Sequence, residues 1–228
     1  MPKFNRRDTI GQFQSLVEKV YSLPDDRLYS IWDLLTQQQR FTMRALKGIR
    51  KQNRAKIKLN LLISLAWLMA IANRLHIDVE KEIWKRFPAH CWHCATRPCK
   101  CGKTKPAKHK KVFIDNSQKP KTLAQYQKMF EEIYPSKKRS LYEAGVHLAE
   151  EMGEVSEAVH NYLGQHKYNQ FNEVEAEIAD FVSCLFGVAN SARINIALEL
   201  EKIFYRNCHV CHKVPCVCGF TAVAEIET

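Results

Sequence analysis

The sequence lacks an N-terminal leader pattern and an apolar run long enough to span a bilayer. Its longest apolar run, LNLLISLAWLMAIA at residues 59–72, is shorter than the roughly 20 residues of a transmembrane helix and contains Asn60. Strand-like alternation is also scarce, whereas apolar residues recur at three- and four-residue spacing. These absences argue against a membrane protein and a sheet-based fold. They predict an all-α, cytoplasmic protein in which residues 59–72 form a buried helix.

Acidic residues are scarce in the first half of the chain. Residues 1–122 contain 26 Lys and Arg but 9 Asp and Glu, whereas residues 123–228 contain 9 basic and 15 acidic residues. The formal net charge of +11 therefore combines two parts of opposite sign. The first part is expected to attract anions and the second to attract cations.

Eight of the nine cysteines form two motifs of identical spacing. CWHCATRPCKCG (91–102) and CHVCHKVPCVCG (208–219) both have the pattern Cys-x2-Cys-x3-Pro-Cys-x-Cys-Gly. Four cysteines so close together are typical of a tetrahedral zinc site, whereas disulfides and an iron–sulfur cluster are less favoured without a secretory leader. We expect two structural Zn²⁺ ions per chain, bound by Cys91, Cys94, Cys99 and Cys101 and by Cys208, Cys211, Cys216 and Cys218. His93, His209 and His212 are alternative ligands, but they do not recur at equivalent positions.

The cysteine motifs belong to a longer internal repeat. Asn73 aligns with Asn190 at the same offset of 117 residues, and FQSLVEKVY (13–21) aligns with YQKMFEEIY (126–134) at an offset of 113. The four-residue difference is expected in the loop after each second helix. The sequence predicts two tandem helical units, 1–102 and 122–228, each ending in a zinc knuckle and joined by a basic linker at 103–121. The expected helices are 8–21, 28–47, 56–75, 78–87, 122–134, 140–164, 173–193 and 195–206.

The stretch HLAEEMGEVSEAV at 147–159 concentrates acids on one helix face. At about 100° per residue, an arc of roughly 120° contains all four of them, Glu150, Glu151, Glu154 and Glu157. The next predicted helix carries Glu177 and Asp180 on one face, and a short connection favours antiparallel packing that would let the acidic faces meet. Such a cluster needs a positive partner, and carboxylates without His or Cys indicate Mg²⁺ or Mn²⁺.

A solvated acidic surface would give the same pattern, but the repeat argues against it. At the six aligned positions the first half has no acid and instead carries Gln37, Gln38, Phe41, Arg44, Asn60 and Ile63. A generic surface would be expected to keep some of the acids. Asp180 also lies inside the apolar stretch IADFVSCLFGVA, where a charge needs a partner. The comparison favours a metal site in the second half only.

LAEEMGEVSEA followed by EIAD resembles the EExxE…ExxD signature of the MazG-like all-α nucleoside triphosphate pyrophosphatases, over residues 122–206. The resemblance implies metal-dependent attack of water on a (d)NTP, giving the monophosphate and pyrophosphate. It also implies that helical units associate, as in a homo-oligomer. Carried over by position, it assigns Mg²⁺ binding to Glu151, Glu154, Glu177 and Asp180, while Glu150 or Glu157 would add a ligand or orient the water. The first half resembles the same fold without these acids.

Basic residues crowd the second predicted helix and the start of the third. They would bind the triphosphate or form a solvated surface, and the candidates are Arg44, Lys47, Arg50, Lys51 and Arg54. Two other functions stay open. One is a catalytically silent scaffold that binds nucleic acid or protein, and the other is a pyrophosphatase for another nucleotide phosphoanhydride. No recognised nucleic-acid motif accompanies the charge, so a nucleotide pyrophosphohydrolase is the favoured prediction.

Overall fold

The computed structural model describes residues 3–101, 110 and 112–219, and within them all regular structure is helical. The all-α prediction is therefore confirmed for this part of the chain. The α-helices are α1 (Ile10–Leu28), α2 (Ile31–Arg50), α3 (Arg54–Arg74), α4 (Val79–Arg86), α5 (Leu123–Ile133), α6 (Leu141–Gln165), α7 (Tyr168–Ser191) and α8 (Ile196–Ile203). Two short 3-10 helices, η1 (Asn116–Gln118) and η2 (Ser136–Lys138), lie on either side of α5.

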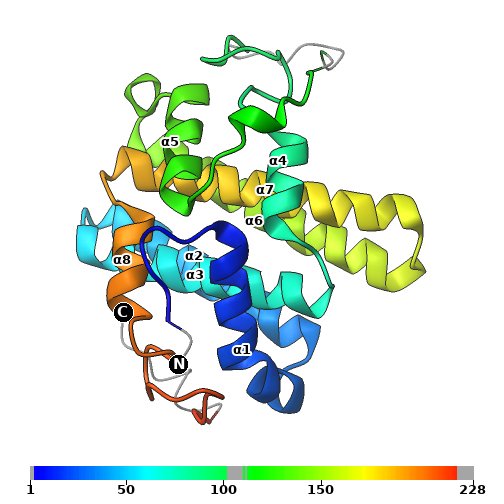
Figure 1. The fold of residues 1–228 in the computed structure, drawn as a ribbon, viewed down its shortest axis with the longest axis vertical. Helices are drawn as coiled ribbons and strands as arrows, with labels where there is room; N and C mark the ends of the chain where they lie inside the picture. The colour runs from blue at the N-terminus through cyan, green and yellow to red at the C-terminus, as the bar shows by residue number, and fades with distance from the viewer. Residues whose placement is uncertain (1–2, 102–109, 111, 220–228) are drawn as a thin grey trace.

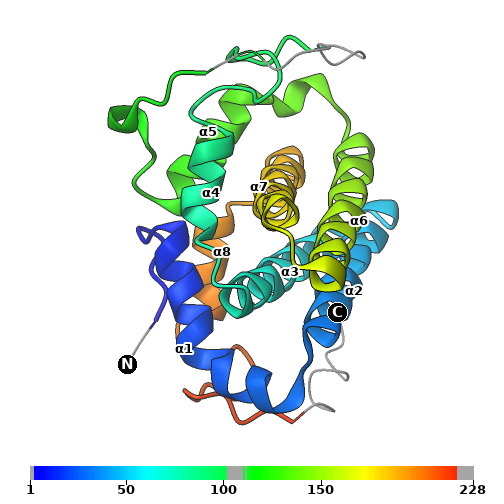
Figure 2. The same cartoon turned by 90° about the vertical axis from the view of Figure 1, so that its right-hand side faces the viewer.

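Helices α3 and α7 lie at the centre of the molecule. α2 and α3 form one helical hairpin, α6 and α7 form a second, and α2 packs against α6 (Figure 1). Figure 2 looks along α7 and shows it between α6 on one side and α4 and α5 on the other. One continuous hydrophobic core contains residues of both halves of the chain.

Each half contributes a short helix and a cysteine segment that contact the opposite half. α4 packs against α7, and α8 packs against α3. The backbone N–H of Cys99 donates to the carbonyl of Ile133 at the end of α5, and that of Cys216 donates to the carbonyl of Val20 in α1, each over 2.7 Å. Each cysteine segment is therefore attached to the opposite half of the chain.

Equivalent hydrogen bonds occur at the two sequence offsets. The side-chain amide of Gln14 donates to the carbonyl of Ile77, and that of Gln127 donates to the carbonyl of Ile194, both over 2.7 Å. Gln14 and Gln127 differ by 113 positions, and Ile77 and Ile194 differ by 117. The residues that align in sequence thus make the same contacts between the first helix of each half and the segment that follows its third helix.

Helix α1 is longer than the sequence predicted. We expected it to end at residue 21, but it continues through Pro24 to Leu28. Pro24 has no N–H and so cannot donate to the carbonyl of Val20, four residues earlier. The N–H of Cys216 supplies that hydrogen bond instead. Pro24 favours an end of the helix when only the local sequence is considered. The hydrogen bond from Cys216, a distant part of the chain, offsets the one that Pro24 cannot make, so the helix continues.

The four extra residues of the second half lie in helices, so the prediction of a longer loop was wrong. Three residues connect α2 to α3, and two residues connect α6 to α7. α7 begins at Tyr168 rather than at residue 173, and α6 ends at Gln165. The residues YNQFN carry little apolar periodicity, which is why their helical conformation was missed.

Helix α3 contains the apolar run noted in the sequence. By length and composition it is the one described helix that could cross a membrane by itself, and the bent pair α7 and α8 passes the same test as a unit. Most of α3 is buried among the other helices, as expected for the core helix of a globular protein. The prediction of a buried helix at 59–72 agrees with this placement.

Candidate functional site

The acidic residues lie on the hairpin formed by α6 and α7. The start of α6 is set by a capping box, in which the Glu143 amide donates to the Ser140 hydroxyl and the Ser140 amide donates to the Glu143 carboxylate. The two-residue connection after Gln165 then reverses the chain direction. The antiparallel arrangement expected from the short connection brings the acids of α6 opposite those of α7.

Three carboxylates form the centre of the cluster. One oxygen atom from each of Glu151, Glu177 and Asp180 lies within 4.8 Å of the other two. Glu154 lies close enough for its charge to act on Glu177. Burial, followed by the negative charges of Asp180 and Glu154, raises the pKa of Glu177 to about 7, whereas the positive charge of Arg86 acts in the opposite direction. The acids are therefore close enough to oppose one another's ionisation.

This cluster fits a divalent cation. All of its donors are oxygen atoms, which suits Mg²⁺ and Mn²⁺. The Oε2 atom of Glu177 is buried, and within the described ranges it has no hydrogen-bond partner. A buried carboxylate oxygen without a donor is costly, and a bound cation would remove that cost.

Glu150 and Glu157 lie toward the edge of the cluster. Glu150 is exposed and close enough to Cys184 for its charge to raise the pKa of that thiol, although burial and Glu151 contribute more. Glu157 is also exposed, and in the described part of the chain it makes no hydrogen bond or ion pair. On the helical wheel Glu157 is the acid farthest from Glu151, so the side of α6 that faces α7 is centred on Glu151 and Glu154.

Arg86 completes the cluster, and sequence reasoning missed it. Its Nε atom donates to Oδ1 of Asp180 over 3.0 Å, and its Nη2 atom donates to Oδ2 over 2.5 Å. Arg86 is the last residue of α4, the helix that packs against α7. The repeat contained a signal, because Arg86 aligns with the apolar Ile203 at an offset of 117.

Comparison with known protein families supports a nucleotide-processing site. Residues 141–215 match the MazG nucleotide pyrophosphohydrolase domain. This match covers 75 of the 228 residues and contains all six predicted acids, α6, α7 and α8. Searches of curated proteins and of solved structures found no match. The second half of the chain therefore carries a MazG-like segment, and the resemblance seen in the acid motif is supported there.

A second arginine lies beside the MazG-like segment. A side chain at Gly187 would collide with the guanidinium of Arg139, so the glycine leaves room for that group. Arg139 lowers the pKa of Cys184, against the larger effect of burial. Arg139 lies between η2 and α6, and no sequence motif predicted its position beside the site.

The structure places Arg54 away from the acids. Its Nε donates to the carbonyl of Ala192 over 3.1 Å, and its Nη2 donates to the carbonyl of Arg193 over 2.5 Å. Twelve residues of helix separate Ala192 from Asp180, which corresponds to about 18 Å along α7. Arg54 therefore lies about three helical turns from Asp180 along α7, and its contribution to substrate binding stays a prediction.

The other predicted phosphate-binding residues lie on α2 and directly after it. The guanidinium of Arg44 lies over the ring of Phe41, 5.6 Å from its centroid. Three more are exposed near the end of α2, and these are Lys47, Arg50 and Lys51. Their contribution to substrate binding stays a prediction.

The first half has an apolar cavity where the second half has its acids. The cavity has a volume of about 50 Å³ and is lined by Ile63, which aligns with Asp180, and by the rings of Tyr29 and Trp67. Asp25 also lines it. This composition cannot replace an oxygen-lined cation site, so the structural difference between the halves agrees with their difference in acids.

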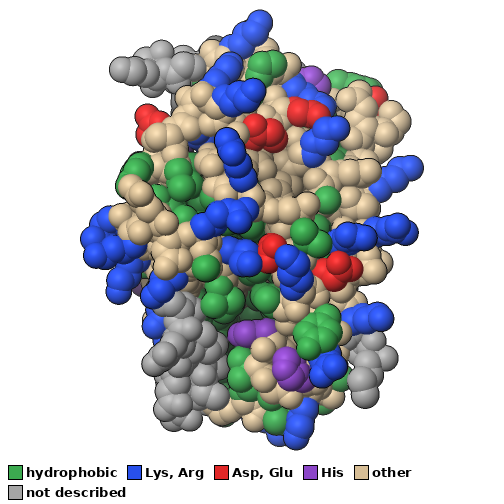
Figure 3. Space-filling model, turned by 90° about the vertical axis from the view of Figure 1, so that its left-hand side faces the viewer, with side chains coloured by type: hydrophobic (Ala, Val, Ile, Leu, Met, Phe, Trp, Pro, Cys, Tyr) green, Lys and Arg blue, Asp and Glu red, His purple; other side chains and the backbone are tan. Residues whose placement is uncertain are grey.

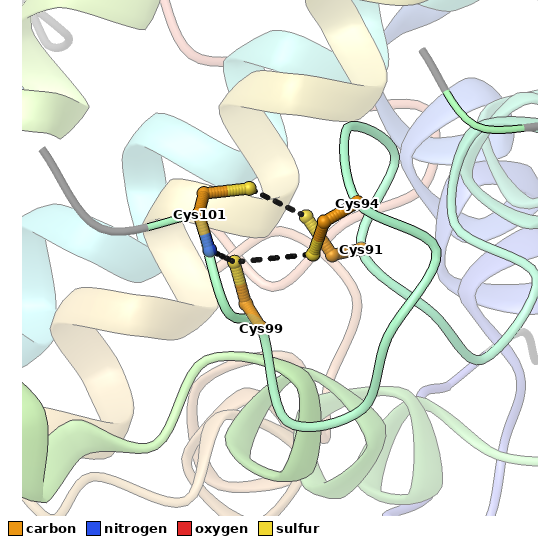
Figure 4. A group of neighbouring side chains, drawn as sticks. All are labelled: Cys91, Cys94, Cys99 and Cys101. Carbon is orange, nitrogen blue, oxygen red and sulfur yellow. Dashed lines mark hydrogen bonds between the residues drawn. The ribbon is translucent and has the colours of Figure 1, made fainter. Parts of the chain in front are cut away.

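The two cysteine clusters have the spacing of tetrahedral sites. In the first cluster the sulfur atoms point toward one another (Figure 4). A Zn–S distance of about 2.3 Å places the sulfurs of a tetrahedral site roughly 3.8 Å apart. The Sγ–Sγ distances are 3.7 Å for Cys91–Cys101, 3.9 Å for Cys94–Cys99, 3.9 Å for Cys208–Cys218 and 3.8 Å for Cys211–Cys216. These separations fit zinc and are far longer than the roughly 2 Å of a disulfide.

Hydrogen bonds favour a thiolate in the first cluster. Burial alone would raise the pKa of Cys94. Contacts from the Thr96 hydroxyl and the Lys100 amide outweigh that effect and lower the pKa to about 6. Burial raises the pKa of Cys99 and Cys101 in the same cluster, so the hydrogen bonds favour the thiolate form, which zinc binds, at Cys94 and not across the cluster.

Proposed function

We propose that this protein is a divalent-metal-dependent pyrophosphohydrolase that converts a (d)NTP and water to the (d)NMP and pyrophosphate. The observation that carries this proposal is the meeting of Glu151, Glu177 and Asp180 within 4.8 Å inside a segment that matches the MazG domain. The family description supports a nucleotide substrate, and the oxygen-only cluster supports Mg²⁺ or Mn²⁺. The choice of a nucleoside triphosphate rests on the resemblance of the acid motif.

The acids differ in burial. Glu151, Glu177 and Asp180 are partly buried and would hold the cation, and Glu154 beside them is exposed. Bound there, Mg²⁺ or Mn²⁺ would neutralise phosphate oxygens and make water a stronger nucleophile. Glu177 has to release its proton before it can bind a cation, because its pKa is raised to about 7. Glu150 and Glu157 remain exposed on the same helix, where either can accept the proton of the attacking water.

The rest of the proposal concerns the architecture. Each half is a helical unit of a tandem duplication, and the equivalent contacts of Gln14 and Gln127 support this origin. The first half has lost metal binding but retains its packing role. Each four-cysteine cluster binds one structural Zn²⁺, in a cytoplasmic location where thiols stay reduced. Association of two chains through the helical units is a further expectation.

The test is hydrolysis of a panel of (d)NTPs in the presence of Mg²⁺, with the products separated by ion-exchange chromatography. We expect monophosphate and pyrophosphate from the wild-type protein. Glu154→Gln and Asp180→Asn should each abolish turnover, because they weaken the acidic cluster. Glu201→Gln on α8, an acid outside the cluster, should retain turnover. Wild-type rates in the Glu154 and Asp180 variants, with folding and zinc content unchanged, would rule out this site.

A catalytically silent scaffold for nucleic acid or protein is the second candidate. Figure 3 shows a face over which Lys and Arg side chains are widely spread while acidic side chains are few. Such a surface is suited to phosphate backbones. If the folded, zinc-loaded protein hydrolyses no nucleotide, RNA and DNA become the next ligands to test. Activity on a nucleoside diphosphate alone would instead indicate the other phosphoanhydride substrates.

A further inference from the structure

Arg86 connects the acids of the second half to the first cysteine cluster. Its fork-shaped contact with Asp180 uses two N–H groups, and both side chains are about one-fifth exposed, at 21% and 18%. The guanidinium also lies over the ring of Trp92, 4.4 Å from its centroid. Asp180 and Trp92 therefore hold the same guanidinium from two directions.

Trp92 is itself held by the cluster that contains it. It follows Cys91 directly and precedes Cys94, and both of these cysteines are buried. The segment is attached to the end of α5 by the hydrogen bond from Cys99 to Ile133. A bound zinc would therefore fix the backbone on both sides of the ring that lies against Arg86.

We propose that Arg86 binds the phosphate chain of the substrate, and that Trp92 and the first zinc site position it. This inference rests on the proposed function and adds the first half of the chain to the active site. A guanidinium has five N–H donors in a planar fork, so with two directed at Asp180 others remain for phosphate oxygens. Partial burial strengthens each of these interactions relative to an exposed lysine.

The repeat shows that this arrangement occurs where the acids are. At the equivalent place in the other half, Ile203 replaces Arg86, Ile63 replaces Asp180 and His209 replaces Trp92. The Nδ1 atom of His209 instead lies 3.2 Å from the hydroxyl of Tyr21. The helix that packs against the opposite half thus ends in an arginine where it faces the acids. In the other half the equivalent residue is an isoleucine, and the corresponding site is apolar. A structural ion pair with Asp180 would give the same correlation, so the measurements below are chosen to separate the two roles.

The test measures the binding of inorganic tripolyphosphate in the presence of Mg²⁺, and of Mn²⁺ alone, by titration calorimetry. Arg86→Ala should weaken tripolyphosphate binding by about tenfold to a hundredfold, as expected for losing hydrogen bonds to a charged group. Mn²⁺ alone should bind at least as tightly as in the wild type, because a competing cation has been removed. Arg86→Lys should lie between the two, since it keeps the charge but loses the fork.

Trp92 has a matched control in the second cluster. Trp92→Ala should weaken tripolyphosphate binding by about threefold to tenfold, and Trp92→Phe should restore most of the loss because it keeps an aromatic face. His209→Ala, at the equivalent position, should leave the affinity unchanged. Zinc content and circular dichroism of each variant identify any loss caused by unfolding.

Several results would overturn the inference. Unchanged tripolyphosphate affinity in Arg86→Ala would remove Arg86 from phosphate binding. Weaker Mn²⁺ binding in that variant, in proportion to the loss of tripolyphosphate, would mean that Arg86 only orients Asp180. Equal losses of tripolyphosphate affinity in Trp92→Ala and His209→Ala would point to a general effect on stability.

Hydrolysis separates failure of this inference from failure of the proposed function. If both the wild-type protein and Arg86→Ala hydrolyse nucleotides with the same KM, the inference fails and the proposed function stands. If neither protein hydrolyses any nucleotide, the proposed function fails.

Discussion

Arg139 packs against Gly187 at a distance that only a residue without a Cβ atom allows. A Cβ atom at Gly187 would overlap the guanidinium of Arg139, whose Nε atom is buried. We predict that Gly187→Ala destabilises the protein by about 1 kcal/mol or less, because the guanidinium has to move but ends a flexible side chain, and the added Cβ itself favours the helix. Urea unfolding measures the change. Gly164→Ala is the control, since an added Cβ there meets no atom within 4 Å, and it should stabilise α6 by roughly 0.5–1 kcal/mol. A gain in stability for Gly187→Ala equal to that of Gly164→Ala would show that Arg139 moves without cost.

Asp25 is a buried acid whose ionisation opposes folding. Its exposed fraction is 7%, and burial raises its pKa to about 7, partly countered by the charge of Arg74. An unfolded chain releases this proton near pH 4, whereas the folded protein keeps it until about pH 7. The stability associated with the neutral form is therefore present below about pH 4 and is lost as the pH rises toward 7.

Asp25→Asn should consequently be more stable than wild type at pH 8, by on the order of 1 kcal/mol or more. The difference should shrink as the pH falls toward 4, where both proteins carry a neutral side chain at this position. Thermal unfolding from pH 4 to pH 8 provides the measurement. Asp26→Asn is the neighbouring control, because Asp26 is mostly exposed and pairs with Arg74 at 3.0 Å. A constant difference between Asp25→Asn and wild type across this range would contradict the assignment.

At the scale of helices, the exchange of α4 and α8 joins the two halves. Each of these short helices packs on the central helix of the opposite half, so neither half covers its own core alone. We predict that a protease site inserted between residues 103 and 109, once cut, leaves the two pieces associated. Gel filtration in native buffer should give one peak with both pieces in equal amounts. The piece 122–228 expressed alone should aggregate, since it exposes the apolar surface that α4 covers. Two separate folded pieces would contradict the exchange.

Much of this helical framework could be predicted from apolar spacing. The predictions for α4 and α6 lie within one residue of the observed ends, because capping residues and periodicity agree there. The end of α1 was missed because its stability past Pro24 depends on a hydrogen bond from Cys216. The offsets of 113 and 117 identified equivalent residues, but an alignment does not say which half a helix packs against.

The site could likewise be predicted where it depends on residues close in sequence, and not where it depends on contacts between distant parts of the chain. The common face of Glu151 and Glu154, and the meeting of α6 with α7, follow from helical geometry over short distances in sequence. Arg86 lies 94 positions from Asp180 and reaches it only because α4 crosses to the other half. The dense basic run at 40–58 was the stronger sequence signal, yet Arg54 lies at the far end of α7. Charge density predicted a basic surface but not the residue that contacts the acids.

On the scale of the whole molecule, the two similar halves differ in what surrounds their cysteine clusters. Both have a four-cysteine cluster attached to the opposite half, but the first cluster lies beside the acids and the second beside the apolar cavity. Zinc should therefore stabilise both sides, while only the first zinc should influence the active site. The different surroundings of the two clusters make this asymmetry measurable with single substitutions.

Cys99→Ser and Cys216→Ser occupy equivalent positions and form a matched pair. Each should reduce the zinc content from two ions per chain to one, and each should lower the Tm by about 5 °C or more, since metal binding contributes to folding. At a temperature where both variants remain folded, Cys99→Ser should also weaken tripolyphosphate binding, because the segment holding Trp92 loosens. Cys216→Ser should retain wild-type affinity. Zinc analysis, thermal unfolding and calorimetry on the same samples separate these effects. If the two variants bind tripolyphosphate equally well, the first cluster has no special connection to the acids, and its role is confined to stability.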